Sequence, residues 1–391
     1  MSAVLRILVC HNRYQLRGGE DAVCESEVAL LREHGHDVQL FERSNAELEE
    51  GSKLAAAAEA IWSRDSGRAF REVLAEFQPH VIHVHNTFAK ISPAIYWEAA
   101  RARIAVVQTL HNFRLLCPQA MFLREGKVCE DCLGKVPWRG AVRACYRGSV
   151  AQSAVLASMV MVHRAFGTWQ NKVTRYIALN EFCRNKFIEG GLPAERIVIK
   201  PNFVDFDAPP EGKREGFLFV GRLSIEKGIE TLVDAVRELD GLEMRVAGTG
   251  PELHLLDGIP GIRALGALDG DAVRSQMSSS VALVLPSIWY ENFPRTLVEA
   301  MACGLPIIAS RIGALADLVD DGVSGLLFEA GNANDLAAKL AWARNNPASL
   351  RAMGVRARAI YEERFTAREN YMQLMSIYED AMEQARKDCG Q

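Results

Sequence analysis

The sequence lacks both an excess of one charge and a long apolar run. Its formal net charge is −4 over 391 residues, so overall charge gives no reason to expect nucleic-acid binding. No uninterrupted apolar run reaches the ~18 residues of a membrane-spanning helix. The start, MSAVLRILVCHN, lacks the layout of a signal peptide, and the nine cysteines are mostly scattered. We therefore expect a cytoplasmic protein with mostly free thiols.

The chain instead contains short apolar segments that alternate with segments of helical period. In the first half the predicted strands are 4–10, 37–41, 81–86, 103–112, 173–180 and 196–202. In the second half they are 217–223, 242–248, 262–268, 281–287 and 305–310. Helical segments such as 22–35, 66–77 and 228–239 lie between them. This repeat predicts the α/β class, with a doubly wound, Rossmann-like parallel sheet in each half.

A polar segment separates the two halves. Residues 204–216, VDFDAPPEGKREG, contain two prolines and show no period, which is typical of a linker. We predict one domain over 1–203, a second over 217–370, and a helix over 371–391 that packs back towards the first domain. The strand carboxyl ends of both domains are expected to face each other across a cleft, where ligands of such sheets bind.

The stretch SIWYENFPRTLVEAMACGLPIIAS predicts a turn, a helix and a strand. Pro294 suits the first helical turn and Gly304 the position beyond its end. The N–H groups of 295–297 should then be free to bind a phosphate. Glu291 in the turn and Glu299 in the helix could accept hydrogen bonds from the hydroxyls of a nucleotide sugar. Two solvated glutamates are the alternative.

A second turn, FVGRLSIEKGIETL, carries two cations five positions apart. Gly221 leaves room for a ligand, and Arg222 and Lys227 could both bind one diphosphate. A surface ion pair with Glu226 is the alternative. In VAGTGPE, Gly248 could let a base or ribose approach closely, or could form only a tight turn.

The first half offers weaker candidates. Gly18 and Gly19 follow the first strand and could bring the backbone close to a ligand, or form a simple turn. His111 ends a predicted strand and could donate to a sugar hydroxyl or stabilise charge, although lone histidines are more often structural. His83, His85 and Asn86 end another predicted strand and are alternative candidates for that role.

Seven motifs together resemble the family-4 retaining glycosyltransferases of the GT-B fold, over nearly the whole chain. They are RGGED, TLHNFR, KPNFVD, FVGRLSIEKGIETLVDA, VAGTGP, ENFPRTLVEAMACGLPIIAS and GVSGLLFEAGNANDLAAKL. The resemblance implies sugar transfer from a nucleotide diphosphate sugar, with retained anomeric configuration and no catalytic metal or other cofactor. It makes the first domain the acceptor side and the second the donor side. We favour UDP over GDP as the nucleotide.

The resemblance also assigns roles to single residues. Arg222 and Lys227 match the diphosphate-binding pair, and Gly19 matches the glycine loop near the diphosphate. Glu299 matches the ribose-binding acid, Glu291 the acid that contacts the donor sugar, and His111 the histidine near that sugar. The donor-binding set that we predict is Gly18, Gly19, Gly221, Arg222, Lys227, Gly248, Glu291, Asn292, Phe293, Leu297 and Glu299. Asn292 departs from the glycine of many members, which leaves the donor sugar open.

The mechanism that we expect depends on charge. Arg222, Lys227 and a helix N-terminus would stabilise the leaving diphosphate. No well-placed carboxylate is an obvious covalent nucleophile, so we favour front-face departure and attack, with the leaving phosphate as base. The catalytic set is then His111, Glu291, Arg222 and Lys227. A nucleotide-sugar epimerase and a non-catalytic nucleotide-sugar binder are the competing functions.

Residues 132–180 contain no acidic residue. The basic members are Lys135, Arg139, Arg143, Arg147, Arg164, Lys172 and Arg175, and the apolar ones include Trp138, Val150, Leu156, Met159 and Met161. Such a segment could lie on an anionic membrane, which would suit a lipid-linked acceptor in cell-surface polysaccharide or glycolipid assembly. A buried helix with charged ends is the alternative.

Four cysteines cluster in one loop-rich segment: Cys117, Cys129, Cys132 and Cys145. Four thiolates could hold a structural zinc tetrahedrally. Because only one C-x2-C pair is present, four free thiols are the other interpretation.

Overall fold

The computed structural model describes residues 4–15, 18–45, 53–205, 212–388 and 390. Contacts divide the chain into two compact units, and each is described here by itself. Unit 1 comprises residues 1–121, 130–200 and 370–391, and unit 2 comprises 122–129 and 201–369. Residues 206–211 of the predicted linker lie outside the described residues, and the predicted domain boundaries stay a prediction.

Unit 1 contains a six-stranded parallel sheet in the order β2-β1-β3-β4-β7-β8. Its strands are β1 (Arg6–Arg13), β2 (Asp37–Ser44), β3 (Val81–Asn86), β4 (Ala105–Thr109), β7 (Arg175–Ala178) and β8 (Ile197–Ile199). The central strands β3 and β4 are buried along their whole length, including the polar side chains that they carry towards their carboxyl ends.

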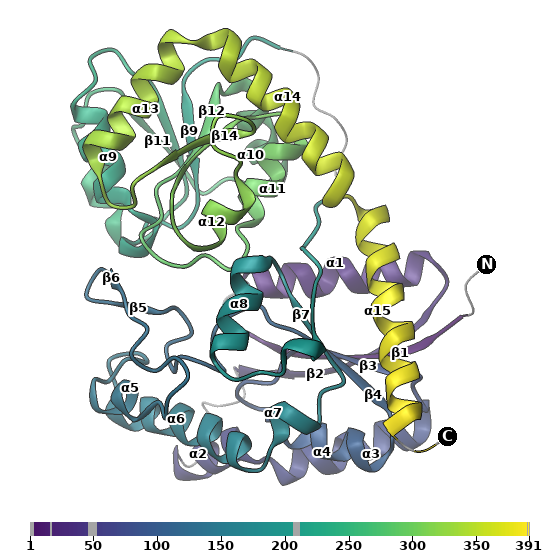
Figure 1. Ribbon diagram of the computed structural model, residues 1–391. Helices are drawn as coiled ribbons and strands as arrows, with labels where there is room; N and C mark the ends of the chain where they lie inside the picture. The colour runs from purple at the N-terminus through teal and green to yellow at the C-terminus, as the bar shows by residue number, and fades with distance from the viewer. Residues whose placement is uncertain (1–3, 16–17, 46–52, 206–211, 389, 391) are drawn as a thin grey trace. The chain divides into compact units, whose positions relative to one another are not determined.

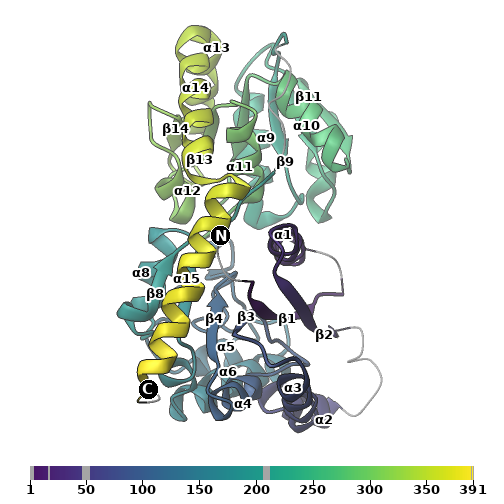
Figure 2. The ribbon, with the colours of Figure 1, turned by 90° about the vertical axis from the view of Figure 1, so that its right-hand side faces the viewer.

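Helices cover both faces of this sheet (Figure 1). The helices α1 (Gly19–Glu33) and α15 (Ala367–Asp388) share a buried cluster with one face, in which Val28 and Leu374 pack near Ile7. The helices α3 (Arg64–Phe77) and α4 (Ala94–Arg101) lie on the other face in both views (Figure 2). The remaining helices assigned mainly to this unit are α2 (Lys53–Ile61), α5 (Trp138–Val142), α6 (Val150–Ala165), α7 (Thr168–Asn171) and α8 (Glu181–Glu189).

Unit 2 contains a second six-stranded parallel sheet, in the order β11-β10-β9-β12-β13-β14. Its strands are β9 (Phe217–Val220), β10 (Met244–Ala247), β11 (Ile262–Gly266), β12 (Ala282–Leu285), β13 (Ile307–Ser310) and β14 (Gly325–Phe328). Its helices are α9 (Ile229–Arg237), α10 (Gly270–Ser279), α11 (Arg295–Ala302), α12 (Gly313–Leu318), α13 (Ala333–Asn345) and α14 (Pro347–Arg364).

Alternate residues of the unit 2 strands enter two separate cores. Leu283 and Leu285 of β12 face α11 and α14, whereas Val284 faces α9 and α13. The sheet is therefore covered on both faces, and the predicted α/β class with two doubly wound parallel sheets is confirmed. Two features were not predicted from the sequence: β14, and a small hairpin of β5 (Leu123–Arg124) and β6 (Lys127–Val128).

In each sheet the chain reverses the direction in which strands are added, and ligands of such sheets bind at that point. The reversal lies between β1 and β3 in unit 1 and between β9 and β12 in unit 2. No helix within the described ranges is long and apolar enough to cross a membrane.

Gly228 tests how tightly the unit 2 turns are packed. A Cβ there would lie 1.9 Å from the carbonyl oxygen of Pro286, whereas at Gly241 it would meet open space; their φ angles are +71° and +69°. Gly241→Ala should cost only about 1 kcal/mol, for the left-handed backbone. Gly228→Ala should destabilise by roughly 1 to 3 kcal/mol more, measured by urea unfolding. Equal losses in the two variants would contradict this packing.

Candidate functional site

In unit 2, a single carboxylate oxygen joins the turns that follow β9 and β12. Oε1 of Glu291 accepts from Nζ of Lys227 at 2.6 Å, from the Ser287 hydroxyl at 2.7 Å and from Nε1 of Trp289 at 3.1 Å. Glu291 is buried. Within the described ranges Oε2 has no hydrogen-bond partner, so this oxygen is available to a ligand.

The two predicted cations differ in their surroundings. Lys227 is engaged with Glu291, and its Nζ lies 5.7 Å from the centre of the Trp289 ring. This geometry replaces the ion pair with Glu226 that the sequence left open, because Glu226 accepts from the Ser224 hydroxyl instead. Arg222 is exposed and has no ion pair among the described residues. Its charge is therefore free for an anionic ligand.

The helix α11 begins after its N-cap Pro294 and is followed by Gly304, whose φ is +58°. One part of the prediction is wrong, because the N–H of Leu297 donates to the carbonyl of Pro294 at 3.0 Å and is not free. The Leu297 side chain is fully buried in the core. Leu297 therefore offers a ligand neither a free N–H nor an accessible side chain.

Glu299 lies one helical turn beyond Arg295, whose Nε donates to Oε1 of Glu299 at 2.9 Å. Burial raises the pKa of Glu299, and the neighbouring guanidinium opposes the rise. Phe293 packs against the core beside Phe365, at 5.8 Å between ring centres, and Asn292 is half-buried in the turn.

The lack of a side chain at Gly248 allows two of the unit 2 turns to approach closely. A Cβ on Gly248 would lie 1.8 Å from the carbonyl oxygen of Gly221, so the turns after β9 and β10 approach at backbone distance. A side chain at 221 would meet only Phe219 at ordinary contact distance. Gly248 is therefore needed for packing, whatever it does for a ligand.

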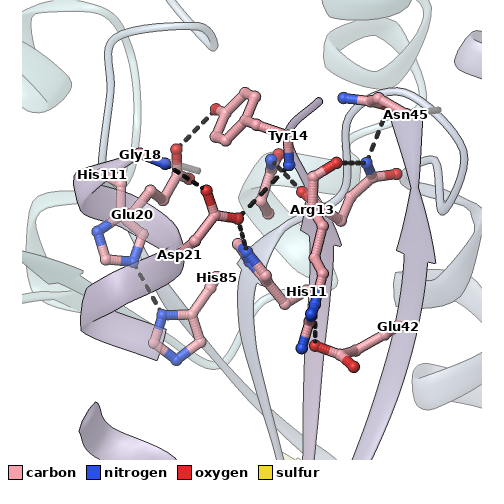
Figure 3. A network of polar contacts seen from close by, with 12 residues as sticks. His11, Arg13, Tyr14, Gly18, Glu20, Asp21, Glu42, Asn45, His85 and His111 are labelled. Carbon is pink, nitrogen blue, oxygen red and sulfur yellow. Dashed lines mark hydrogen bonds and ion pairs between the residues drawn. The ribbon is translucent and has the colours of Figure 1, made fainter. Parts of the chain in front are cut away.

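In unit 1, the turn after β1 is held by the first residues of α1 (Figure 3). Asp21 accepts from the N–H of Gly18 at 2.7 Å and lies 2.8 Å from Nε2 of His11. The Tyr14 hydroxyl donates to Glu20 at 2.6 Å. The N–H of Gly18 is thus already used, whereas a Cβ on Gly19 would have no neighbour within 4 Å.

His111 follows β4 and contacts a second histidine at the end of β3. Its Nε2 lies 2.9 Å from Nδ1 of His85, as Figure 3 shows. On the far side, Nε2 of His85 lies 3.5 Å from Oε2 of Glu27. Glu27 is also paired with Lys200, and both side chains are fully buried. Of the competing residues in β3, His85 therefore lies behind His111.

Burial determines the charge of this histidine group. It lowers the pKa of His83 and of His85 well below the ordinary value, and that of His111 in the same direction. Burial alone would raise the pKa of Glu27, but the ammonium of Lys200 and the nearby His85 outweigh it and lower the pKa. Near neutral pH the histidines are uncharged and Glu27 is ionised.

Glu27, His83 and His85 each offer a ligand atom within 4.8 Å of the others, close enough to consider a metal ion. The arrangement fits hydrogen bonding better. Nδ1 and Nε2 of His83 each lie 2.8 Å from a hydroxyl, those of Tyr378 and Thr109. The ammonium of Lys200, bound to Glu27, would repel a cation.

The four clustered cysteines do not all fall in one unit. Cys117, Cys132 and Cys145 lie in unit 1, and Cys129 lies in unit 2. Cys117 and Cys132 are buried, the other two half-buried, and none forms a disulfide. The structural zinc stays a prediction.

Only part of the segment 132–180 is exposed at the surface. Leu156 and Met159 are buried in α6, so the prediction that they interleave with surface cations is wrong. Arg143 pairs with Asp131, and Arg175 pairs with Asp380 of α15. Three apolar residues in and beside α5 remain exposed: Val136, Trp138 and Val142.

Several hydrogen-bond and ion-pair partners of the site residues were not predicted from the sequence. Ser287 and Trp289 are hydrogen-bond donors within four residues of Glu291, and that proximity could have indicated their role. Lys200 follows an apolar strand, which is an unusual place for an unpaired lysine. Its partner Glu27 is 173 positions away, and no local pattern could have identified it.

The buried histidines predict a pH dependence of stability. In the unfolded chain they gain protons below about pH 6.5, whereas burial lowers the pKa of His83, His85 and His111 in the folded state, so that they gain protons only at lower pH. The unfolded state then binds more protons, so stability falls as the pH drops below that value. The maximum slope is about 1.4 kcal/mol per pH unit for each histidine.

Urea unfolding between about pH 7 and about pH 5 measures this slope. His83→Gln can keep bonds to Tyr378 and Thr109 but removes one titrating group, so its slope should be shallower. A free energy of unfolding that is constant over this range would contradict the assignment of neutral histidines.

Comparison with known proteins identifies the family of the chain. A family model described as Glycosyltransferase Family 4 matches residues 17–208, and one described as Glycosyl transferases group 1 matches residues 203–360. An uncharacterized glycosyltransferase of Methanocaldococcus jannaschii is 32% identical over 212 residues, which cover 53% of this chain and 59% of the relative. The match thus spans about three fifths of that relative.

A phosphatidyl-myo-inositol mannosyltransferase of Mycobacterium leprae is 30% identical over 260 residues, which cover 61% of this chain and 67% of the relative. A crystal structure of HepE from Anabaena in complex with UDP has a TM-score of 0.67 at 18% identity, covering 95% of this chain and 99% of that chain. The structural likeness shows the fold. Together with the family matches, it shows that the chain belongs to the family-4 glycosyltransferases, a retaining family of the GT-B fold.

Proposed function

We propose that this chain is a retaining glycosyltransferase that moves a sugar from a nucleotide diphosphate sugar to a hydroxyl of a glycan or lipid-linked acceptor. The observation that carries the proposal is the switch point of unit 2, where the direction of strand addition reverses between β9 and β12. There the exposed Arg222 and the Lys227–Glu291 pair lie at the carboxyl ends of β9 and β12. Cations and a carboxylate in adjacent turns suit a ligand that carries both phosphates and hydroxyls.

Each residue has a separate task in this proposal. Arg222 and Lys227 bind the diphosphate and stabilise the charge that develops on it as the sugar leaves. Oε2 of Glu291 accepts from a hydroxyl of the donor sugar, and Glu299 accepts from the ribose. His111 acts near the transferred sugar. No metal is required for this charge stabilisation, because the two cations supply it.

The nucleotide is proposed to be UDP rather than GDP. The structural relative from Anabaena was crystallised with UDP, which supports this preference. The relative from Mycobacterium leprae is named for a lipid acceptor, which supports a lipid-linked acceptor here. We place the reaction in the cytoplasm, at the inner face of the membrane, in cell-surface polysaccharide or glycolipid assembly.

A panel of UDP- and GDP-sugars tests the function. The cognate donor should raise the melting temperature, because ligand binding stabilises the folded state by mass action. Arg222→Met should weaken donor binding about 10- to 100-fold, since it removes a charge-assisted contact. Arg263→Met is the matched control, because Arg263 is exposed in β11 of the same unit; its affinity should be unchanged.

Products separate the competing functions. A transferase releases nucleoside diphosphate in proportion to a glycoside of retained configuration. An epimerase converts the donor without an acceptor, and a non-catalytic binder leaves it intact. Either of the last two results, or equal binding by Arg222→Met and the wild type, would overturn the proposal.

The exposed face of α5 supports the membrane part of the proposal. Trp138 and Val142 lie one turn apart on this helix and are 55% and 67% exposed, and Val136 precedes them. The exposed cations Lys135 and Arg147 flank them in sequence. An apolar helix face with adjacent cations suits an interface with anionic lipid, where each cation contributes about 1 kcal/mol.

Co-sedimentation with vesicles tests this face. The protein should pellet with vesicles that contain anionic phospholipid and should pellet less as that lipid is replaced by a zwitterionic one. The double variant Trp138→Ser/Val142→Ser should lose most of the binding. Val355→Ser is the control, because Val355 is 74% exposed on α14 of the other unit. Binding that ignores anionic lipid content would argue against the membrane face.

A further inference from the structure

The hydrogen bond between His111 and His85 admits two proton arrangements. Nε2 of His111 and Nδ1 of His85 lie 2.9 Å apart, so one of these nitrogens donates and the other accepts. A neutral imidazole carries one N–H and one bare nitrogen. The choice at this contact therefore decides which nitrogen of His111 is bare.

The choice is made at the far side of His85. Its Nε2 lies 3.5 Å from Oε2 of Glu27, and the described residues give neither of these buried atoms a closer hydrogen-bond partner. A carboxylate only accepts, and Lys200 keeps this one ionised through the other oxygen. A bare Nε2 would direct its lone pair at a negative charge, so Nε2 of His85 carries the proton.

We propose that the buried Glu27–Lys200 pair, acting through His85, holds His111 in the tautomer protonated on Nε2, with an unprotonated Nδ1. In this state Nδ1 of His85 is bare and accepts from His111. Glu27, Lys200 and His85 are then positioning residues. The proposal rests on the proposed function only for what His111 does to a substrate.

The tautomer limits the chemistry of His111. Within the described ranges Nδ1 has no hydrogen-bond partner, and it is not one of the fully buried atoms. As a bare nitrogen it can accept a hydrogen bond or a proton from a hydroxyl, but it cannot donate one. Burial also lowers the pKa of His111, which favours the neutral ring. A sugar or acceptor hydroxyl would therefore donate to His111, the reverse of the direction expected from the sequence.

Nitrogen NMR of histidine-labelled protein reads the tautomer directly, because bare and protonated ring nitrogens resonate far apart. The unliganded wild type should show His111, assigned with His111→Gln, as the Nε2-protonated form. Glu27→Gln should reverse it. Lys200 would hold the amide oxygen, so the amide N–H group would face His85 and make its Nε2 an acceptor. The proton of His111 would then move to Nδ1.

Tyr378→Phe is the matched control. The Tyr378 hydroxyl bonds Nδ1 of His83 in the same buried group, and within the described ranges it has no hydrogen bond with His85 or His111. This variant should leave the His111 tautomer unchanged. If Glu27→Gln does not fold, the double variant Glu27→Leu/Lys200→Leu removes the pair without leaving a buried charge, a kind of exchange that is often neutral for stability. It should give a mixture of both His111 tautomers.

Three results would overturn the proposal. They are a wild-type His111 protonated on Nδ1, a doubly protonated ring, or a tautomer that does not change in any folded Glu27 variant. The spectra need no nucleotide sugar and no turnover. Loss of the proposed transferase function would therefore leave this test intact, and failure of this test would leave the transferase assay unaffected.

Discussion

A parallel sheet brings the carboxyl ends of all its strands to one edge, and both candidate sites depend on this constraint. In unit 2 it brings the turn after β9 next to the turn after β12, so that Nζ of Lys227 reaches Oε1 of Glu291 across 64 positions of sequence, at 2.6 Å. In unit 1 the same constraint brings the end of β3 beside the end of β4, where His85 meets His111. Neither contact needs a long or specialised loop. Glycines then decide how closely the turns approach, as at Gly248 against the backbone of Gly221.

The candidate sites of the two units differ in how exposed their charged side chains are. In unit 2 the Arg222 guanidinium is exposed and Lys227 is only partly buried, which would suit the proposed binding of a diphosphate. In unit 1 the Glu27–Lys200 pair is completely buried, and burial keeps the adjoining His83 and His85 neutral. If His111 acts on the sugar as proposed, its neutral imidazole would not repel the positive charge that develops on the sugar ring as the bond to phosphate breaks.

The sequence was most informative where the signal is local. Alternating strands and helices gave both sheets, and the spacing of Arg222, Lys227 and Glu291 placed them in the turns at one switch point. It failed where the partner is distant. Residues 132–180 contain no acid, yet Arg143 and Arg175 find counter-ions outside that window, in Asp131 and Asp380. Likewise, helical period alone did not reveal which face of α6 is buried, since that depends on the elements packed against it. The prediction of a free N–H at Leu297 was wrong for a different reason. This N–H donates locally, to the carbonyl of the N-cap residue Pro294.

The surroundings of Glu291 bear on how configuration could be retained. A covalent route would need this carboxylate to attack the sugar, and its nucleophilicity depends on free electron density. Oε1 already accepts from an ammonium, a hydroxyl and an indole N–H, all of which withdraw that density. Charge-assisted hydrogen bonds of this kind stabilise the ionised carboxylate and make covalent attack less favourable. The same three contacts restrict the orientation of Oε2, which would suit the proposed hydrogen bond from one sugar hydroxyl. These contacts therefore favour the proposed role of Glu291 in orienting the donor, and the expected front-face departure, with the leaving phosphate as base, would require nothing more of it.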